Sequence, residues 1–347
     1  MKVLMKGNEA IAEAAIRAGC DAYFGYPITP QTEVLEYMSR RMPDLGRVFV
    51  QAESELGAAN MVYGAACTGV RVMTTTSSPG YSLMQEAISY IAMSFVPCVI
   101  VNIMRGGPGL GNIQPAQGDY FQMTKGGGHG DYHLIVLAPS TVQETVDLVI
   151  EAFDLADKYC QPVTVIADGL IGQIMEPVDF PQLKEPERPE RPWALTGARD
   201  RKKNIITSLF LGAQNLEREN IRLQEIITEI RANEVRYAEY MMDGAEIVVV
   251  AYGTAGRIVQ TAVKQARAEG IPAGLFRPIS MFPFPYERLG EIKDTARQFL
   301  VVELSAGQMI EDVRLATHCS KPIAFFGKLG GIVPLPEEIL DEIKKLL

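Results

Sequence analysis

The chain has 347 residues, more than one ordinary core requires, and this length predicts two or three domains with substantial apolar interiors. The net charge of −9 and the pI near 5.1 argue against binding of nucleic acid through its phosphates and favour a small-molecule or protein partner. Residues 1–19 lack the uninterrupted apolar core of a signal peptide, and no apolar run reaches membrane-spanning length, so we expect a cytoplasmic protein.

Residues 1–179 alternate between helical stretches and short apolar strands, which is typical of a parallel sheet covered by helices on both faces. The runs at 98–104 and 162–167 are continuously apolar, as strands of a doubly covered sheet are. We expect strands at residues 22–25, 47–51, 71–75, 98–104 and 162–167. We expect helices at residues 8–18, 31–40, 55–66, 81–94 and 142–158.

The composition changes sharply at residues 177–181 and 185–192, where repeated prolines and charges forbid helix and sheet and predict a semi-rigid extended linker. This boundary closes a first domain over residues 1–180. In residues 215–242, apolar residues at spacings of three, four and seven predict one amphipathic helix. That helix either packs on a neighbouring domain or contacts another subunit. Linker and helix together occupy residues 181–243.

A second α/β unit is predicted over residues 244–347. It begins with a strand at 247–251, the sequence GTAG at 253–256 and a helix, followed by a strand at 273–276, a helix near 286–299 and a strand at 299–303. The lone G-x-x-G could cradle a phosphate at a helix N-terminus. The complete G-x-G-x-x-G is absent, however, and close packing of strand on helix requires glycine equally often.

Four loops of the first domain follow predicted strands. They are YPITP at 26–30, the stretch around Glu55, TTTSSPG at 74–80 and RGGPGLGN at 105–112. In an open parallel sheet such loops gather along the carboxyl edge, where ligands bind. The glycine run at 106–111 is not a nucleotide P-loop, because no Gly-Lys-Ser/Thr follows it.

Each of these loops has a plain structural explanation as well. Glu55 could complement the positive end of a helix dipole, and Thr29, held between two prolines, could cap the helix at 31–40. The hydroxyl run at 74–78 supplies donors and acceptors beside a helix start, or only a cap. Arg105 ends an apolar strand, where it could pair with a ligand carboxylate or form a structural ion pair. Glu53 is expected to face another way than Glu55 on the helix.

Histidine and cysteine give weaker signals. His129 lies in the glycine-dense run GGGHG, where it could be an acid, a base or a substrate contact, but no partner for it is identified. The five cysteines lie far apart without a C-x-x-C pair, so we do not expect a metal or iron–sulfur centre held by this chain alone. They are predicted to be buried thiols of a reducing compartment: Cys20, Cys67, Cys98, Cys160 and Cys319.

Taken together, YPITP, ELGAA at 55–59, residues 75–79 and Arg105 resemble the alpha subunit of 2-oxoacid:ferredoxin oxidoreductases, which are thiamine-diphosphate enzymes. The resemblance covers nearly the whole chain. Each motif alone is weak, but the four in this order and spacing are specific. Further segments are most similar to the branched-chain (2-ketoisovalerate) type, with 2-oxoglutarate and pyruvate members as near neighbours: residues 118–131, 192–197, 277–285 and 306–314.

The resemblance implies an α/β fold, with a pyrimidine-binding domain of the thiamine-diphosphate fold followed by a transketolase C-terminal-like domain. In this family a Gly-Asp-Gly motif holds magnesium and the cofactor's diphosphate. This chain lacks that motif, and Ala167-Asp-Gly169 is its nearest approach. A beta subunit is therefore implied to supply the diphosphate and Mg²⁺ site and an iron–sulfur cluster. Gamma and ferredoxin-like delta subunits and ferredoxin are further implied partners.

The implied reaction is oxidative decarboxylation of a 2-oxo acid to acyl-CoA and CO2, with coenzyme A as a substrate and ferredoxin as the electron acceptor (EC 1.2.7), active only with the partner subunit. By resemblance, Glu55 hydrogen-bonds the aminopyrimidine ring and activates the cofactor. Arg105 lies near the substrate carboxylate, and Thr29, with Ile28, lies near substrate and coenzyme A. The remaining cofactor contacts are Thr75, Ser77, Ser78 and Pro79.

Other interpretations remain. The chain could be a 2-oxoglutarate or pyruvate ferredoxin oxidoreductase subunit, working in the oxidative or the carboxylating direction. It could instead be a non-catalytic assembly subunit with a vestigial pocket, although Glu55, Thr29 and Arg105 are all present. A dehydrogenase-type or transketolase-type enzyme without ferredoxin is disfavoured, because the diphosphate motif and other cofactor fingerprints are missing.

Overall fold

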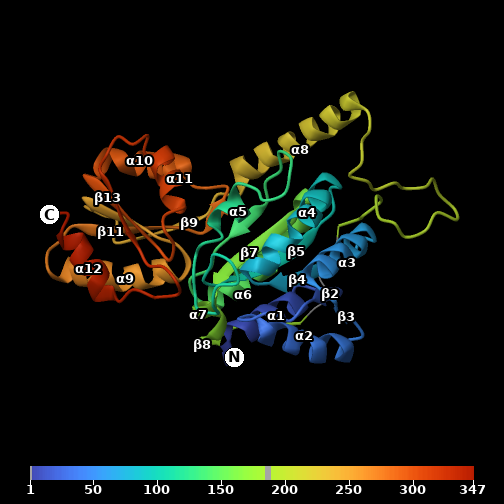
Figure 1. Ribbon diagram of the computed structural model, residues 1–347, viewed down its shortest axis with the longest axis horizontal. Helices are drawn as coiled ribbons and strands as arrows, with labels where there is room; N and C mark the ends of the chain where they lie inside the picture. The colour runs from blue at the N-terminus through green and yellow to red at the C-terminus, as the bar shows by residue number, and fades with distance from the viewer. Residues whose placement is uncertain (1, 184–188) are drawn as a thin grey trace.

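Figure 1 shows the computed structural model, which describes residues 2–183 and 189–347. The chain begins with β1 (Val3–Lys6), which pairs antiparallel with β8 (Met175–Val178). The expectation that residues 177–181 exclude sheet is therefore wrong: Pro177 lies opposite Leu4 in this two-stranded ribbon, whose edges accommodate a proline. Residues 185–188 of the expected linker lie outside the described residues.

The first domain is built on a seven-stranded sheet in the order β12-β6-β7-β5-β4-β2-β3. Its parallel strands are β2 (Ala22–Gly25), β3 (Val48–Gln51), β4 (Val72–Thr76), β5 (Cys98–Met104), β6 (Ile135–Leu137) and β7 (Pro162–Asp168). Every residue of β5 and β7 is buried, as the continuous apolar runs predicted. The antiparallel edge strand β12 (Ser280–Phe282) comes from much later in the chain and pairs with β6.

Helices cover both faces of this sheet (Figure 1). One layer consists of α1 (Gly7–Arg17), α2 (Thr32–Asp44) and α6 (Val142–Tyr159), in which α1 contacts both others. The small side chains of α1, among them Ala10, Ala12 and Ala14, are fully buried and allow this close packing. On the other face, α3 (Glu55–Cys67) packs against α4 (Ser78–Met93). The short helices are α5 (Tyr120–Thr124) and α7 (Gly169–Gln173).

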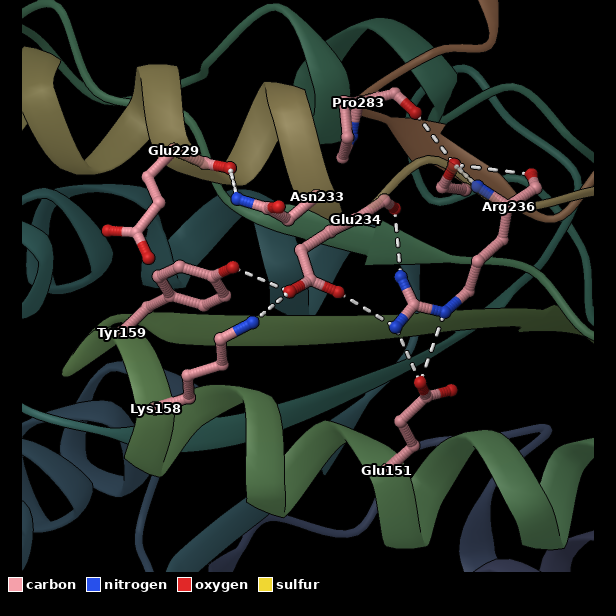
Figure 2. A network of polar contacts seen from close by, with 9 residues as sticks. Glu151, Lys158, Tyr159, Glu229, Asn233, Glu234, Arg236 and Pro283 are labelled. Atoms are coloured by element: carbon pink, nitrogen blue, oxygen red, sulfur yellow. Dashed lines mark hydrogen bonds and ion pairs between the residues drawn. The ribbon is translucent and has the colours of Figure 1, made fainter.

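The long helix predicted over residues 215–242 is shorter than expected. Helix α8 (Ala213–Asn233) ends at Asn233, and the chain continues into the strand β9 (Tyr237–Tyr240). The reason is Glu234, whose buried carboxylate accepts hydrogen bonds from Lys158 Nζ (2.6 Å), Tyr159 OH (2.5 Å) and Arg236 Nη2 (2.8 Å) (Figure 2). These contacts hold the chain against α6 and direct the following residues into a sheet, which a local periodicity cannot reveal.

The second domain contains a five-stranded sheet in the order β14-β13-β10-β11-β9, parallel except for β9. Its other strands are β10 (Ile247–Val250), β11 (Ala273–Pro278), β13 (Gln298–Glu303) and β14 (Ile323–Gly327). Its helices are α9 (Gly253–Ala268), α10 (Tyr286–Thr295), α11 (Met309–Ala316) and α12 (Pro336–Lys344). Helices α9 and α12 pack together on one side, and α10 and α11 pack together on the other (Figure 1). The helix predicted near 286–299 ends at Thr295, because β13 already begins at Gln298.

Candidate active site

The loops at the carboxyl ends of β2, β3, β4 and β5 meet around a cavity of about 510 Å³, which we call the substrate cavity. Members of all four predicted loops line it: Pro27, Ile28, Thr29, Thr32, Glu55, Pro79, Gly80, Leu83, Arg105 and Leu110. The wall is mainly apolar, with one carboxylate and one guanidinium. This composition suits a small organic anion.

Glu55 is the first residue of α3, and its side chain is 6% exposed. Ser54 holds the N-cap position and accepts the Gly57 N–H at 3.0 Å, so the cap of this helix does not depend on the Glu55 side chain. Among the described residues, none donates a hydrogen bond to the Glu55 carboxylate. Glu53 precedes the helix and its carboxylate lies against Gly57, so the expectation that it shares a helix with Glu55 is wrong.

Gly80, in the first turn of α4, brings α4 close to Glu55. A Cβ atom at this position would lie 2.1 Å from Thr76 Oγ1 and 2.7 Å from Glu55 Oε1. Only glycine permits this approach. The local sequence Ser78-Pro-Gly therefore sets the space in which the Glu55 carboxylate lies.

Arg105 follows β5 and is 8% exposed. Its Nη1 donates to the Thr29 carbonyl (2.9 Å) and its Nη2 to the Leu110 carbonyl (3.0 Å), while Nε has no partner within residues 2–183 and 189–347. No carboxylate of the described residues lies within ion-pair distance of it, so the interpretation as a structural ion pair fails there. A buried guanidinium with an open N–H is suited to bind a ligand carboxylate.

The hydroxyl run at 74–78 divides into two groups. Thr75 Oγ1 contacts Tyr23 OH and Gln31 Oε1, each at 2.6 Å, so it lies behind the substrate cavity rather than on its wall. Gln31 also holds the N-cap position of α2, which excludes Thr29 from that role. The hydroxyls of Thr76 and Ser77 are buried and have no hydrogen-bond partner among the described residues.

A second cavity, of about 600 Å³, lies between the two domains, and we call it the interdomain cavity. It shares Pro79 and Arg105 with the substrate cavity and is also lined by Ser78. The second domain contributes residues 304–306, 308 and 329–330. Asp119 and Gln308 on this wall were not predicted as site residues, because their segments contributed only to the family resemblance. The Gly-Asp pair at 118–119, soon after the glycine run, was the available signal.

Other candidates lie outside these cavities. His129 is exposed and lines neither of them. Cys20, Cys67 and Cys98 are buried, but Cys160 is half-buried at the end of α6 and Cys319 is exposed after α11, so the prediction of buried thiols is wrong for these two. Within residues 2–183 and 189–347 no group of three metal-ligating side chains occurs. Nor does that part of the chain hold a helix of the length and apolarity needed to traverse a bilayer.

A larger cavity, of about 860 Å³, lies beside residues 281–287. Its cations already have partners on this chain: Lys125 pairs with Asp312 at 2.5 Å, Arg288 pairs with a glutamate of β9, and Arg231 lies over the Phe282 ring. The substrate cavity, with its unpaired Arg105, is the better candidate for an anionic ligand.

Family models match nearly the whole chain. Residues 13–243 match the family described as pyruvate flavodoxin/ferredoxin oxidoreductase, thiamine-diphosphate-binding. Residues 245–339 match pyruvate:ferredoxin oxidoreductase core domain II. The first match alone covers more than half of the chain.

Relatives of known function agree. The chain is 52% identical over 343 residues to ketoisovalerate oxidoreductase subunit VorB of Methanothermobacter thermautotrophicus, covering 99% of this chain and 97% of the relative. It is 37% identical over 365 residues to 2-oxoglutarate synthase subunit KorA of Methanothermobacter marburgensis, covering 98% and 97%.

Solved structures show the same fold. A 2-oxoglutarate:ferredoxin oxidoreductase from Magnetococcus marinus, with 2-oxoglutarate, coenzyme A and succinyl-CoA bound, matches with a TM-score of 0.88 and 27% identity. The match covers 99% of this chain and 65% of that one. A split-gene transketolase matches in fold alone, with a TM-score of 0.63 and 14% identity. These matches confirm the expected α/β fold and the family resemblance. The chain therefore belongs to the pyruvate flavodoxin/ferredoxin oxidoreductase family and is a 2-oxoacid:ferredoxin oxidoreductase subunit with a thiamine-diphosphate-binding domain.

Proposed function

We propose that this subunit binds the aminopyrimidine end of thiamine diphosphate and the carboxylate of a branched-chain 2-oxo acid, with 2-ketoisovalerate as the favoured substrate. The assembled enzyme converts it to acyl-CoA and CO2 with reduction of ferredoxin. One observation carries this proposal: the buried, carboxylate-free Arg105 and the donor-free Glu55 lie on the walls of one largely apolar cavity.

The charge of the cavities favours an apolar substrate side chain. Among the described residues that line the substrate and interdomain cavities, Arg105 is the sole cation. One carboxylate of a 2-oxo acid would occupy it, which leaves no cation among these described lining residues for the second carboxylate of 2-oxoglutarate. Ile28, Leu83 and Leu110 supply apolar surface for an aliphatic side chain. The high identity to a ketoisovalerate oxidoreductase subunit supports the same choice.

The residues around Glu55 fit an aminopyrimidine ring. Close approach of α4 at Gly80 shapes the space at the carboxylate, and the hydroxyls of Thr76 and Ser77 are buried without partners nearby. When bound, thiamine diphosphate supplies the nucleophilic carbon and the electron sink for decarboxylation. Glu55 holds a proton at the ring nitrogen, where the apolar wall and the burial of its side chain exclude competing water. Arg105 orients the substrate carboxylate.

The rest of the site belongs to partner subunits in this proposal. A beta subunit supplies the diphosphate and Mg²⁺ site and an iron–sulfur cluster, with gamma and ferredoxin-like delta subunits as further partners. Exposed apolar side chains on the cavity walls support a covering partner: Leu110 lines the substrate cavity and Leu329 the interdomain cavity. Ile113, Ile332 and Leu335, which lie close to them in sequence, are also exposed. We further propose the division into residues 1–180, 181–243 and 244–347, which agrees with the boundary between the two family matches at 243–245.

The substrate is tested by purifying the chain with its partner subunits and comparing 2-ketoisovalerate, 2-oxoglutarate and pyruvate in the coenzyme-A-dependent reduction of ferredoxin or a viologen dye. We expect the highest kcat/KM with 2-ketoisovalerate. Preference for 2-oxoglutarate would contradict the charge argument. A colourless complex would contradict the iron–sulfur partner.

The role of Glu55 is tested by Glu55→Ala in the same complex. We expect turnover to fall at least about 1,000-fold with an unchanged unfolding temperature, because the group that holds the ring proton is lost. Glu53→Ala is the matched control, since Glu53 lies outside the cavity wall. If Glu55→Ala retained decarboxylation, the alternative of a non-catalytic assembly subunit would be supported instead.

A further inference from the structure

A short chain of hydrogen bonds runs from Arg105 to a buried carboxylate on the interdomain wall. The Arg105 backbone N–H donates to Ser78 Oγ at 3.0 Å, and the Ser78 hydroxyl donates to Asp119 Oδ2 at 2.5 Å. Asn102 Nδ2 donates to the same oxygen at 2.9 Å. Asp119 is 8% exposed and lines the interdomain cavity with Ser78 and Arg105. The position of Arg105 at the end of β5 is therefore tied to the position of Asp119.

On one side of Asp119, Gln117 anchors the chain to the second domain. Gln117 is fully buried, and its Nε2 donates to the Tyr252 carbonyl at 2.9 Å. Its Oε1 accepts the Leu304 N–H at 2.9 Å, while its own N–H donates to the Leu304 carbonyl at 2.8 Å. Together with a longer hydrogen bond from Tyr252 OH to the Gln117 carbonyl (3.4 Å), these contacts fasten this residue to the ends of β10 and β13.

On the other side, Gln308 anchors the chain. Its Nε2 donates to the Gly118 carbonyl and its Oε1 accepts the Phe121 N–H, each at 2.8 Å. Gln308 is itself held by the buried Glu303, whose carboxylate accepts backbone N–H groups of residues 308–310 at 3.0 to 3.2 Å. Asp119 is therefore flanked on both sides by contacts to the second domain.

We propose that Asp119 is a positioning residue for Arg105, and that the second domain sets its place through Gln117 and Gln308. This inference rests on the proposed function, in which Arg105 binds the substrate carboxylate. The Arg105 guanidinium donates to two backbone carbonyls, and no carboxylate of the described residues lies within ion-pair distance to orient it. Its direction depends on its backbone, and displacement by 1 Å weakens a bidentate carboxylate contact strongly.

The burial of the Asp119 carboxyl and its hydrogen bonds agree with a fixed position that serves function. Burial raises the pKa of its carboxyl even though Ser78 and Asn102 donate to it. A buried acid with this unfavourable environment is costly to the fold. What the orientation of Arg105 requires at this place is an acceptor for the Ser78 hydroxyl, which a carboxylate or an amide oxygen provides.

The test uses the complex assembled with its partner subunits and compares Asp119→Ala with Asp119→Asn. Alanine removes the acceptor for Ser78, so KM for 2-ketoisovalerate and Kd for the unreactive 2-hydroxyisovalerate should rise about tenfold, with KM for coenzyme A unchanged. Asparagine keeps an oxygen at this place and should restore both values to within about twofold of wild type.

Two further variants test the chain of contacts without removing Asp119. Ser78→Ala should raise KM for the 2-oxo acid in the same way, and the double variant with Asp119→Ala should be no worse than the stronger single variant, because both act through one path. Gln308→Glu loses the donor to the Gly118 carbonyl and should raise KM about threefold. These variants keep the inference testable if Asp119→Ala fails to assemble.

Arg105→Leu separates this inference from the proposed function. If Arg105→Leu raises KM while Asp119→Ala, Ser78→Ala and Gln308→Glu change only the unfolding temperature, the positioning role is overturned and the proposed function stands. If Arg105→Leu leaves KM unchanged, the proposed substrate contact itself fails. Glu234→Gln is the control for a buried acid away from both cavities, and it should lower the unfolding temperature without a change in KM.

Discussion

Two buried polar clusters of this molecule are built in opposite ways. At the junction of α8 and β9, the Glu234 carboxylate accepts from Lys158, Tyr159 and Arg236, and Arg236 also pairs with Glu151 (Figure 2). At the carboxyl edge of the first sheet, Thr76 Oγ1, Ser77 Oγ and Arg105 Nε have no hydrogen-bond partner in the part of the chain that the structure describes. Because buried polar groups are normally paired, we assign the first cluster to the stability of the fold and propose that the second binds a ligand.

The buried acids Glu234 and Asp119 also differ, in the direction in which their surroundings shift the pKa. Burial by itself would raise the pKa of Glu234, but its hydrogen bonds from Lys158, Tyr159 and Arg236 outweigh burial and lower that pKa. Burial raises the pKa of Asp119, and its donors do not offset it. The junction of α8 and β9 thus stabilises the ionised form of Glu234, whereas the surroundings of Asp119 disfavour its ionised form.

After the loss of Glu55 itself, the largest expected effect is on activity, at Gly80. In Gly80→Ala the new methyl group would meet Thr76 Oγ1 and Glu55, so the Glu55 carboxylate must move. We expect kcat/KM to fall about 100-fold in the assembled complex. Gly64→Ala is the matched control, because a Cβ at Gly64 in α3 meets nothing within 4 Å and should leave activity unchanged. Equal activity of the two variants would refute the close approach at Glu55.

The next largest expected effect is a loss of stability at the junction of α8 and β9. Glu234→Ala leaves Arg236, Lys158 and Tyr159 without their shared acceptor, so the free energy of unfolding should fall by about 3 kcal/mol, with KM for the 2-oxo acid unchanged. Denaturant unfolding measures it. Glu229→Ala, at an exposed position of α8, should change stability by less than about 0.5 kcal/mol.

Two substitutions that each remove one hydroxyl compare a hydrogen-bonded group with a group that has no partner among the described residues. Tyr159→Phe removes a donor to Glu234 and should lower the free energy of unfolding by about 1 kcal/mol. Thr76→Val removes a buried hydroxyl that has no partner, so it should raise the free energy of unfolding by about 0.5 to 1 kcal/mol in the absence of thiamine diphosphate. Calorimetry of the thiamine-free complex measures both. Equal destabilisation by the two variants would show that Thr76 is paired.

The smallest expected effect is the pH dependence of these differences. Because the pKa of Glu234 is lowered below 4.5, its stabilisation relative to Glu234→Gln is complete above pH 4.5 and is lost as the pH falls through the folded pKa. Because the pKa of Asp119 is raised above 3.8, wild type should gain stability relative to Asp119→Asn as the pH falls through that raised pKa. Unfolding measured from neutral to acidic pH should show opposite trends for the two variants.

Part of the fold was predictable because short stretches of sequence specify it. The apolar runs at 98–104 and 162–167 became β5 and β7, because a strand covered on both faces must be apolar throughout. The end of α8 was not predictable, because Glu234 finds Lys158 and Tyr159 about 75 residues earlier in the chain. Pairing across long sequence distances also explains the unexpected strands β1, β8 and β12.

In the candidate site, too, some residues could be predicted from the sequence and others could not. The residue types Glu55 and Arg105 could be identified in loops after strands, and the structure places both on one cavity. Thr75, from the same motif, faces Tyr23 and Gln31 instead, since alternate residues of a strand point to opposite sides. The sequence could not indicate a role for Asp119 and Gln308, because their hydrogen bonds join residues up to 190 positions apart in the chain.

The sequence by itself determined the alternation of strands and helices, the loops that follow the strands, and the family to which the chain belongs, because periodicity and short motifs act over a few residues. Only the tertiary structure decided which buried polar groups find partners. The Glu234 cluster is satisfied and the cluster around Thr76, Ser77 and Arg105 is not. The physical reason is that hydrogen bonding inside a protein is a property of neighbours in space, which folding brings together from distant parts of the chain.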